Sequence, residues 1–155
     1  MSGYFLTFSM GFNRDKGLDD GRLCLRHLED GTLIVWVATS STESKQDAED
    51  FHEKGGLIPP EYRVPGLGNW SVKTAPIPMP QTKGVEGNFY QILPFEVKTD
   101  KGGVRGDFGI HKDANAPGSL GCIVMSDKRF KGFEGKMKEL SAEGIKDVPL
   151  FVSYS

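Results

Sequence analysis

The chain has 155 residues and a formal net charge of -2 at pH 7, a length that suits one domain with a buried core, residues 1–155. The slightly acidic balance argues against a nucleic-acid binder, which needs a basic surplus, and no apolar run approaches a membrane span. Its 20 glycines and 9 prolines favour a β-rich, turn-rich domain over a helical bundle.

The first forty residues predict three strands. Residues 4–8 alternate weakly, residues 22–28 alternate polar and apolar side chains, and residues 33–38 form a strong β run. An Asp-Gly turn at Asp30 joins the second and third runs, which predicts a hairpin. The N-terminus is apolar but has no basic leader, so we expect no signal peptide.

The middle of the chain predicts less regular structure. The charged residues 44–54 suit a short surface helix on which His52 is solvated. Residues 65–80 contain several prolines, which lack a backbone donor, so an irregular, extended loop is expected there. Trp70 lies in this loop and suits either a substrate groove or simple packing.

The C-terminal half predicts further strands and one helix. Residues 88–97 form a strand with Pro94 at an edge or bulge, and residues 148–154 form the last strand. Between them, Ser126 or Asp127 caps a packing helix. The apolar residues of that helix are Phe130, Phe133, Met137 and Leu140. The pattern predicts a mainly β fold, a bent sheet or sandwich with one or two short helices.

A histidine and a cysteine stand at the two ends of one turn-rich loop. His111 ends the apolar run 108–110, and Cys122 precedes the apolar run 123–125. If these runs are neighbouring strands, the imidazole lies within reach of the thiol, lowers its pKa and yields the nucleophilic thiolate. Gly121 can adopt backbone angles that leave N–H groups facing a reacting carbonyl. The alternative is a small core thiol and a histidine with only a structural role.

This segment resembles the active-site motif of the L,D-transpeptidase catalytic domain (YkuD-like). That motif is a histidine, a spacer, then Ser/Thr-His-Gly-Cys, an apolar residue and usually arginine. The matching residues are His111, Ser119, Gly121, Cys122 and Ile123. Three positions differ: Leu120 replaces the second histidine, Val124 replaces the arginine, and Lys112 stands where a small residue is usual. Divergent members, including phage proteins and secreted antibacterial effectors, show similar changes.

The resemblance implies a cysteine enzyme that acts on L,D peptide bonds of peptidoglycan stem peptides, as an L,D-carboxypeptidase or L,D-transpeptidase. Cys122 is then the nucleophile and His111 the base, with the carbonyl of Lys112 orienting the imidazole. The N–H groups of Leu120, Gly121 and Cys122 hold the oxyanion. The serine of the motif, Ser119, completes the expected catalytic set.

The expected substrate-binding residues come from three parts of the chain. Residues 58–62 resemble a proline-tyrosine turn that backs the cleft in the family, so Tyr62 is one candidate. Trp70 and Asn115 are the others. No cofactor is expected, and no metal, because the histidines and cysteines show no close ligand spacing.

Delivery and partners follow from the same interpretation. Without an export signal, the protein is made in the cytoplasm and reaches the cell wall or periplasm by lysis, in a virion or through a secretion system. A stem peptide is the expected partner, nucleic acid is not, and a wall-weakening phage or effector protein is the favoured role. The alternative is a catalytically degenerate module of a virion or secretion apparatus that binds wall peptides, for which Leu120 and Val124 are the supporting features.

Overall fold

The computed structural model describes residues 2–11, 21–40, 51–52, 56–113 and 121–155. It is 45% strand and 15% helix, which confirms the predicted mainly β fold. The described elements, in chain order, are β1 (Tyr4–Met10), β2 (Gly21–His27), β3 (Leu33–Ala38), the 3-10 turn η1 (Glu61–Arg63), β4 (Trp70–Lys73), β5 (Ile77–Met79), β6 (Gly87–Leu93), β7 (Glu96–Lys98), β8 (Val104–Gly106), β9 (Gly109–Lys112), β10 (Ile123–Met125), α2 (Asp127–Ala142) and β11 (Asp147–Tyr154).

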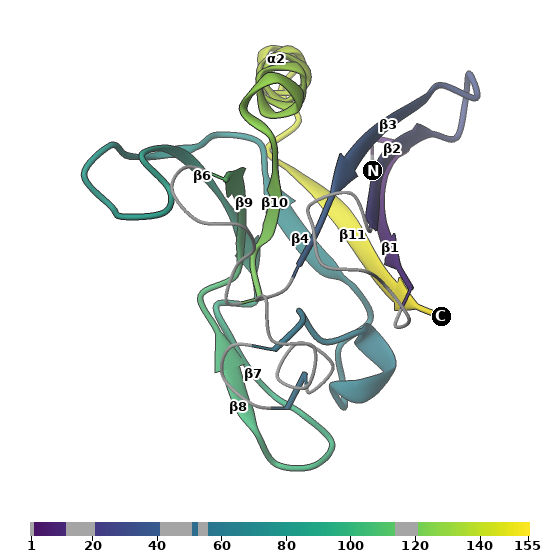
Figure 1. Cartoon of the computed structure of the whole chain (residues 1–155). Helices are drawn as coiled ribbons and strands as arrows, with labels where there is room; N and C mark the ends of the chain where they lie inside the picture. Colours follow the sequence, from purple (N-terminus) through teal and green to yellow (C-terminus); the bar gives the residue numbers. More distant parts are fainter. Residues whose placement is uncertain (1, 12–20, 41–50, 53–55, 114–120) are drawn as a thin grey trace.

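Most strands belong to one curled, mixed sheet. Its order is β10-β9-β6-β4-β11-β1-β2-β3, with β5 paired to β6 and a separate hairpin of β7 and β8. The two ends of the sheet meet where Thr39 and Val124 exchange backbone hydrogen bonds of 2.9 and 2.8 Å. Figure 1 shows the two wings that this curl creates. We call β11, β1, β2 and β3 the terminal wing, and β6, β9 and β10 the site wing.

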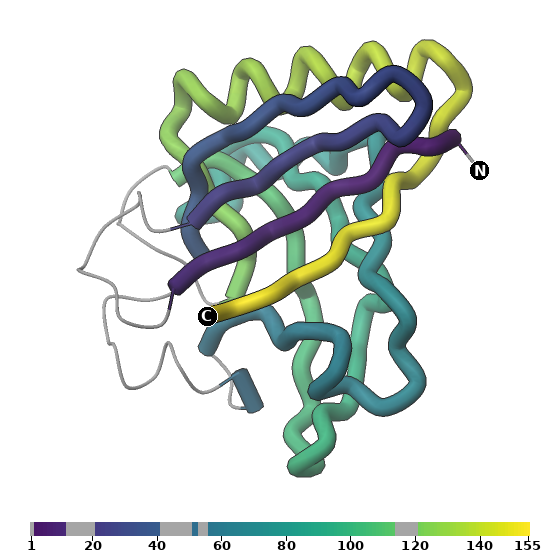
Figure 2. Tube along the Cα trace, turned by 90° about the vertical axis from the view of Figure 1, so that its right-hand side faces the viewer, coloured from purple at the N-terminus to yellow at the C-terminus, as the bar shows by residue number. Residues whose placement is uncertain are grey.

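The terminal wing follows the alternation in its sequence. The predicted hairpin of β2 and β3 is present, with Leu23 opposite Trp36. Leu23 and Leu25 point inward and are fully buried. The last strand, β11, pairs in parallel with β1, so the first and last strands lie side by side in this wing, with the two termini at opposite ends of the pair (Figure 2). All four strands of this wing were predicted from the sequence, by alternation over residues 4–8 and 22–28, by the strong β run 33–38 and by the closing apolar segment 148–154.

The prediction of an irregular loop over residues 65–80 was wrong. β4 lies between β11 and β6 in the sheet, and Ser71 and Val72 are paired on both sides. The strand occupies the stretch between Pro65 and Pro76, where no proline removes a ladder donor. Alternation over only four residues was too short a signal beside the prolines around it.

The predicted strand over residues 88–97 is divided at Pro94 into β6 and β7. Proline has no N–H for the ladder, so pairing ends at Leu93. The predicted helix is confirmed as α2, with Ser126 as its N-cap accepting from the Arg129 N–H at 3.4 Å. Its four predicted apolar residues are buried.

Helix α2 lies over both wings of the sheet (Figure 1). Phe133 packs edge-on against Trp36 of β3, with ring centroids 5.4 Å apart, and Phe130 packs against Tyr90 of β6 at 5.8 Å. The helix thus ties the terminal wing to the site wing through aromatic contacts. None of the described residues forms a helix long and apolar enough to cross a membrane.

Candidate active site on the site wing

His111 lies on β9 with its imidazole orientation fixed by the backbone. Its Nδ1 is 2.7 Å from the carbonyl oxygen of Lys112. A carbonyl can only accept, so Nδ1 carries the proton and Nε2 keeps a lone pair. Burial lowers the pKa of His111 below its usual 6.5, while the hydrogen bond to Lys112 opposes that shift. The imidazole is therefore neutral at pH 7 and has a free base on Nε2.

Cys122 directly precedes the neighbouring strand, β10. β9 and β10 are parallel, with Ile123 opposite Ile110 and Val124 opposite His111. Continued by one residue, this register puts Cys122 beside Gly109, on the same face as His111 and two residues away from it. Strand spacing and rise place the two Cα atoms about 8 Å apart, a distance that a cysteine and a histidine side chain together can span.

This face of the site wing carries a small apolar layer of its own. Phe89 of β6 stacks on the His111 ring, with centroids 6.0 Å apart and planes at 25°. The Phe89 ring also fills the place where a side chain at Gly109 would be. Val124, opposite His111, is completely buried. Phe89 and Val124 thus flank the imidazole, and the second of them occupies the position where the family motif usually has arginine.

The thiol opens onto a cavity of about 550 Å³. The described residues that line this cavity are Thr82, Glu96, Val104, Arg105, Gly106, Asp107 and Cys122. The thiol donates a long hydrogen bond to the carbonyl of Asp107, with a sulfur–oxygen distance of 3.8 Å. Burial raises the pKa of the Cys122 thiol to about 11, against a smaller opposite effect of the Gly109 N–H and of Arg105.

The Cys122 thiol and the His111 imidazole are therefore both neutral near pH 7. Within the described contacts, the hydrogen bonds of Cys122 and His111 go to backbone atoms and not to each other. The arrangement differs from a preformed thiolate–imidazolium pair. It suits a base that takes the thiol proton as the sulfur attacks.

Gly121 has the backbone freedom that the sequence predicted. Its φ is +103°, a region that side chains rarely adopt. A Cβ here would lie 2.7 Å from both the Arg105 guanidinium and the Phe108 ring, and 2.9 Å from the Gly56 carbonyl. The turn before Cys122 therefore requires glycine for its backbone angle and for close packing.

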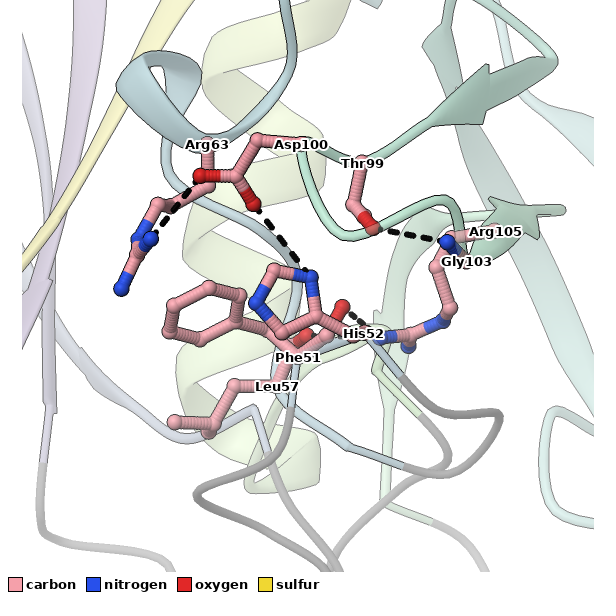
Figure 3. A network of polar contacts seen from close by, with 8 residues as sticks. All are labelled: Phe51, His52, Leu57, Arg63, Thr99, Asp100, Gly103 and Arg105. Atoms are coloured by element: carbon pink, nitrogen blue, oxygen red, sulfur yellow. Dashed lines mark hydrogen bonds and ion pairs between the residues drawn. The ribbon is translucent and has the colours of Figure 1, made fainter.

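Buried Arg105 organises the backbone beside the cavity (Figure 3). Its guanidinium donates to the carbonyl oxygens of Phe51 at 2.7 Å, Gly56 at 2.9 Å and Leu57 at 3.1 Å. The same cation lies 5.0 Å from the centre of the Phe108 ring. A charged side chain that is only 4% exposed needs such partners to offset its desolvation.

His52 lies in the same network, which corrects its predicted solvated position. Its side chain is 11% exposed, and Nδ1 is 3.6 Å from a carboxylate oxygen of Asp100. Asp100 also pairs with Arg63 at 2.8 Å, as Figure 3 shows. Of the predicted helix over 44–54, residues 51 and 52 are described, and they form a turn. Residues about fifty positions apart bury this histidine, and no local pattern reports that.

The other predicted site residues are placed as follows. Trp70 is completely buried, donates from Nε1 to the Pro59 carbonyl at 2.9 Å and packs on Phe108, so of its two predicted roles the structure supports packing, not groove lining. Tyr62 is 71% exposed and is not among the described residues lining the Cys122 cavity. The Lys112 side chain points to Asp127, at 3.9 Å. Asn115, Ser119 and Leu120 lie outside the described residues.

Sequence reasoning missed several residues of this site. Phe89 and Arg105 contact it from other strands, and Ser40 donates from Oγ to the Gly121 carbonyl at 2.8 Å. The sequence carried one usable signal. Gly109 lies in a predicted apolar strand, and a glycine in a strand indicates that another group approaches the backbone closely there.

A larger cavity of about 720 Å³ lies beside β1 and β11, where Phe5, Leu28 and Phe151 contribute to its lining, but its described lining residues include neither a cysteine nor a histidine. Groups of three or more potential metal ligands do not occur in the described part of the chain.

Comparisons of the chain with protein-family models, with curated proteins and with solved structures found no match. Function therefore has to be inferred from the site itself.

Proposed function

We propose that the protein is a cysteine acyl-transfer enzyme acting at L,D peptide bonds of peptidoglycan stem peptides, as an L,D-carboxypeptidase or L,D-transpeptidase. The observation that supports it is the position of Cys122 directly before β10, which pairs in parallel with β9, the strand that carries an oriented, neutral His111. The substrate class comes from the resemblance of the segment 111–124 to the L,D-transpeptidase motif.

The reaction begins with the sulfur of Cys122 attacking the carbonyl carbon at the L-centre of the scissile bond. Nε2 of His111 accepts the thiol proton as the carbon–sulfur bond forms. The tetrahedral intermediate then breaks its carbon–nitrogen bond, and the same proton passes to the departing amine of the D-amino acid. A thioester on Cys122 remains. Water releases it in the carboxypeptidase reaction, and an amine accepts it in the transpeptidase reaction.

Oxyanion stabilisation is assigned to the N–H groups of Leu120, Gly121 and Cys122. The positive φ of Gly121 supports this assignment, since it turns successive peptide planes toward one side. Lys112 contributes its backbone carbonyl to orient His111 and takes no part through its ammonium group.

The neutral state of both groups determines how the pair works. A thiol pKa of about 11 leaves almost no thiolate near pH 7, so the proton must leave during the attack. His111 is available as base because burial lowers its pKa. Catalytic hydrogen bonds are often long in the free enzyme and shorten when substrate binds. We therefore assign general-base catalysis rather than attack by a resting thiolate.

The biological role that we propose is wall weakening, by a phage protein or a delivered effector. The support is the resemblance to divergent members of the family, including phage proteins and secreted antibacterial effectors, which show similar changes in the motif. Here those positions carry Leu120 and Val124. In this role the protein trims or exchanges stem peptides and does not build routine cross-links.

A second candidate function is a non-catalytic module that binds wall peptides within a virion or secretion apparatus. Two observations favour it: the raised pKa of the Cys122 thiol and the buried Val124 where the motif usually has a cation. Both would follow if the site had lost catalysis and kept its shape.

Mass spectrometry of muropeptides distinguishes the two candidates. Purified protein is incubated with tetrapeptide stems, with and without an amine acceptor, beside Cys122→Ala and His111→Gln. We expect the wild type to release or exchange the terminal D-amino acid, Cys122→Ala to be inactive and His111→Gln to lose activity about 100-fold or more. Unchanged peptides with retained binding would favour the module. Unchanged peptides without binding would contradict both.

A further inference from the structure

Ser40 lies at the seam where the two ends of the curled sheet meet. It follows Thr39, whose backbone pairs with Val124 of β10. Ser40 is completely buried, although the seam brings it next to the turn that carries Cys122. A buried hydroxyl at such a point needs hydrogen-bond partners.

The hydroxyl of Ser40 joins two segments of backbone. It donates to the carbonyl oxygen of Gly121 at 2.8 Å and accepts from the N–H of Ile58 at 3.3 Å. The donor and acceptor roles are unambiguous, because a carbonyl cannot donate and an amide N–H cannot accept. One side chain thus joins the backbone of Gly121, which lies 81 positions further along the chain, to that of Ile58, which lies 18 positions further.

The bond to Gly121 fixes the direction of a peptide plane. The Gly121–Cys122 peptide is trans, since the only cis peptide among the described residues precedes Pro94. In a trans peptide the C=O and the N–H point in opposite directions. A carbonyl held toward Ser40 therefore turns the N–H of Cys122 away from Ser40 and the buried seam.

Arg105 also packs against this turn. Its guanidinium and the Gly56 carbonyl pack against the α-carbon of Gly121, and Arg105 is itself held by the carbonyls of Phe51 and Leu57. The α-carbon of Gly121 is thus confined by packing. The peptide plane that follows it takes its direction from the hydroxyl of Ser40.

We propose that Ser40 is a positioning residue for acyl transfer at Cys122. By holding the Gly121 carbonyl, it directs the Cys122 N–H to the position where the oxyanion of the tetrahedral intermediate forms. The inference rests on the proposed acyl-transfer function, in which that N–H stabilises the developing charge. Ser40 touches neither the substrate nor the reacting sulfur.

The test compares two reactions of the same sulfur. Acylation of Cys122 by p-nitrophenyl acetate passes through an oxyanion, whereas alkylation by iodoacetamide does not. The ratio of the two rates therefore reports oxyanion stabilisation and cancels changes in thiol accessibility or ionisation. Both rates are measured on intact protein by mass spectrometry, with Cys122→Ala to subtract any reaction at Cys24.

Ser40→Ala should lower the acylation-to-alkylation ratio about tenfold, a part of the loss seen when an oxyanion donor is removed outright. Ser40→Thr keeps the hydroxyl and should restore the ratio. The matched control is Thr74→Ala, which removes another buried hydroxyl that donates to a backbone carbonyl, that of Ile145 at 2.6 Å. Its ratio should stay at the wild-type value even where its thermal midpoint falls.

The outcomes separate this inference from the function on which it rests. An unchanged ratio in Ser40→Ala, an equal loss in Thr74→Ala, or a ratio in Ser40→Thr as low as in Ser40→Ala would overturn the role of Ser40. A lowered ratio in Ser40→Ala together with a wild type that leaves stem peptides intact would uphold the positioning role and reject the proposed substrate.

Discussion

The terminal wing and the site wing belong to the same curled sheet, but their residues are held in place by different contacts. In the terminal wing, β1, β2 and β3 follow one another along the chain and pair with their sequence neighbours. In the site wing, the turn before Cys122 is held by Ser40, 81 residues away, and the adjoining backbone is held by Arg105 across about fifty residues.

Because of this difference, we expect the terminal wing to determine the stability of the fold and the site wing to determine the reactivity of Cys122. The terminal wing buries large apolar side chains against the main core, so its residues contribute mainly to the free energy of unfolding. The face of the site wing that carries His111 and Cys122 buries few large apolar side chains. Its glycines, its polar side chains and the shifted pKa values of His111 and Cys122 determine how the sulfur reacts. Substitutions in the first wing should change stability, and those in the second should change the chemistry of Cys122.

The largest expected effect is in the terminal wing. Phe8 is completely buried, so Phe8→Ala should lower the free energy of unfolding by about 3–5 kcal/mol. Phe151→Ala, in the same wing but 42% exposed, should cost much less. Urea unfolding measures both. If the two variants lost equal stability, the inward face would not be the source of this wing's stability.

Gly121→Ala should affect both properties, because it lies in the site wing but is closely packed. The positive φ costs about 1–3 kcal/mol for a residue with a side chain, and the new Cβ displaces Arg105 or Phe108. Acylation of Cys122 should fall by more than stability alone explains. Gly135→Ala is the control: it lies on α2 with nothing near its Cβ and should gain up to about 1 kcal/mol.

The structure of the terminal wing was easier to predict from the sequence than that of the site wing, for a physical reason. Alternation and helical spacing report which side of one element is buried, so the strands of the terminal wing and the buried face of α2 were predictable. The same reasoning missed β4, where prolines hid four alternating residues. It also left the role of Trp70 open, although that side chain is completely buried.

For the site, sequence could indicate His111, Cys122 and Gly121, because strand ends and a glycine are local features. It could not indicate Ser40, Phe89 or Arg105, since their contacts depend on how the sheet curls. His52 was misplaced for the same reason: the partner that lies beside it, Asp100, is distant in sequence.

The ionisation of Cys122 is the next difference between the wings. Because burial raises its pKa to about 11, alkylation by iodoacetamide should be slow near pH 7 and rise about tenfold per pH unit up to that value. The rate of adduct formation, followed by mass spectrometry, gives the profile. A plateau already reached below pH 9 would show a thiolate at rest and contradict the general-base assignment.

The pH dependence of stability provides a smaller effect. The pKa of His111 is lowered by burial, so the unfolded chain binds its proton more readily, and stability should fall as the pH drops below the ordinary value of 6.5. His111→Gln should remove that part of the loss. Unfolding curves on either side of pH 6.5 measure it, and identical pH dependence in wild type and variant would argue against a buried, neutral imidazole.

The smallest effect is expected at Tyr62. Its side chain is largely exposed and is not among the described residues lining the cavity, so Tyr62→Ala should change stability by no more than about 0.5 kcal/mol. Turnover of stem peptides should also be unaffected. A clear rise in KM would instead place Tyr62 in a longer substrate groove, as the family resemblance implied.

The most direct test of the account is to look for an acyl group on Cys122. Intact-protein mass spectrometry after mixing with a tetrapeptide stem should show a transient adduct with the mass of the peptide less its terminal D-amino acid. The adduct should be absent in Cys122→Ala and form much more slowly in His111→Gln. A wild type that never carries the adduct while the peptide remains intact, or an adduct that forms equally fast without His111, would contradict the cysteine–histidine pair.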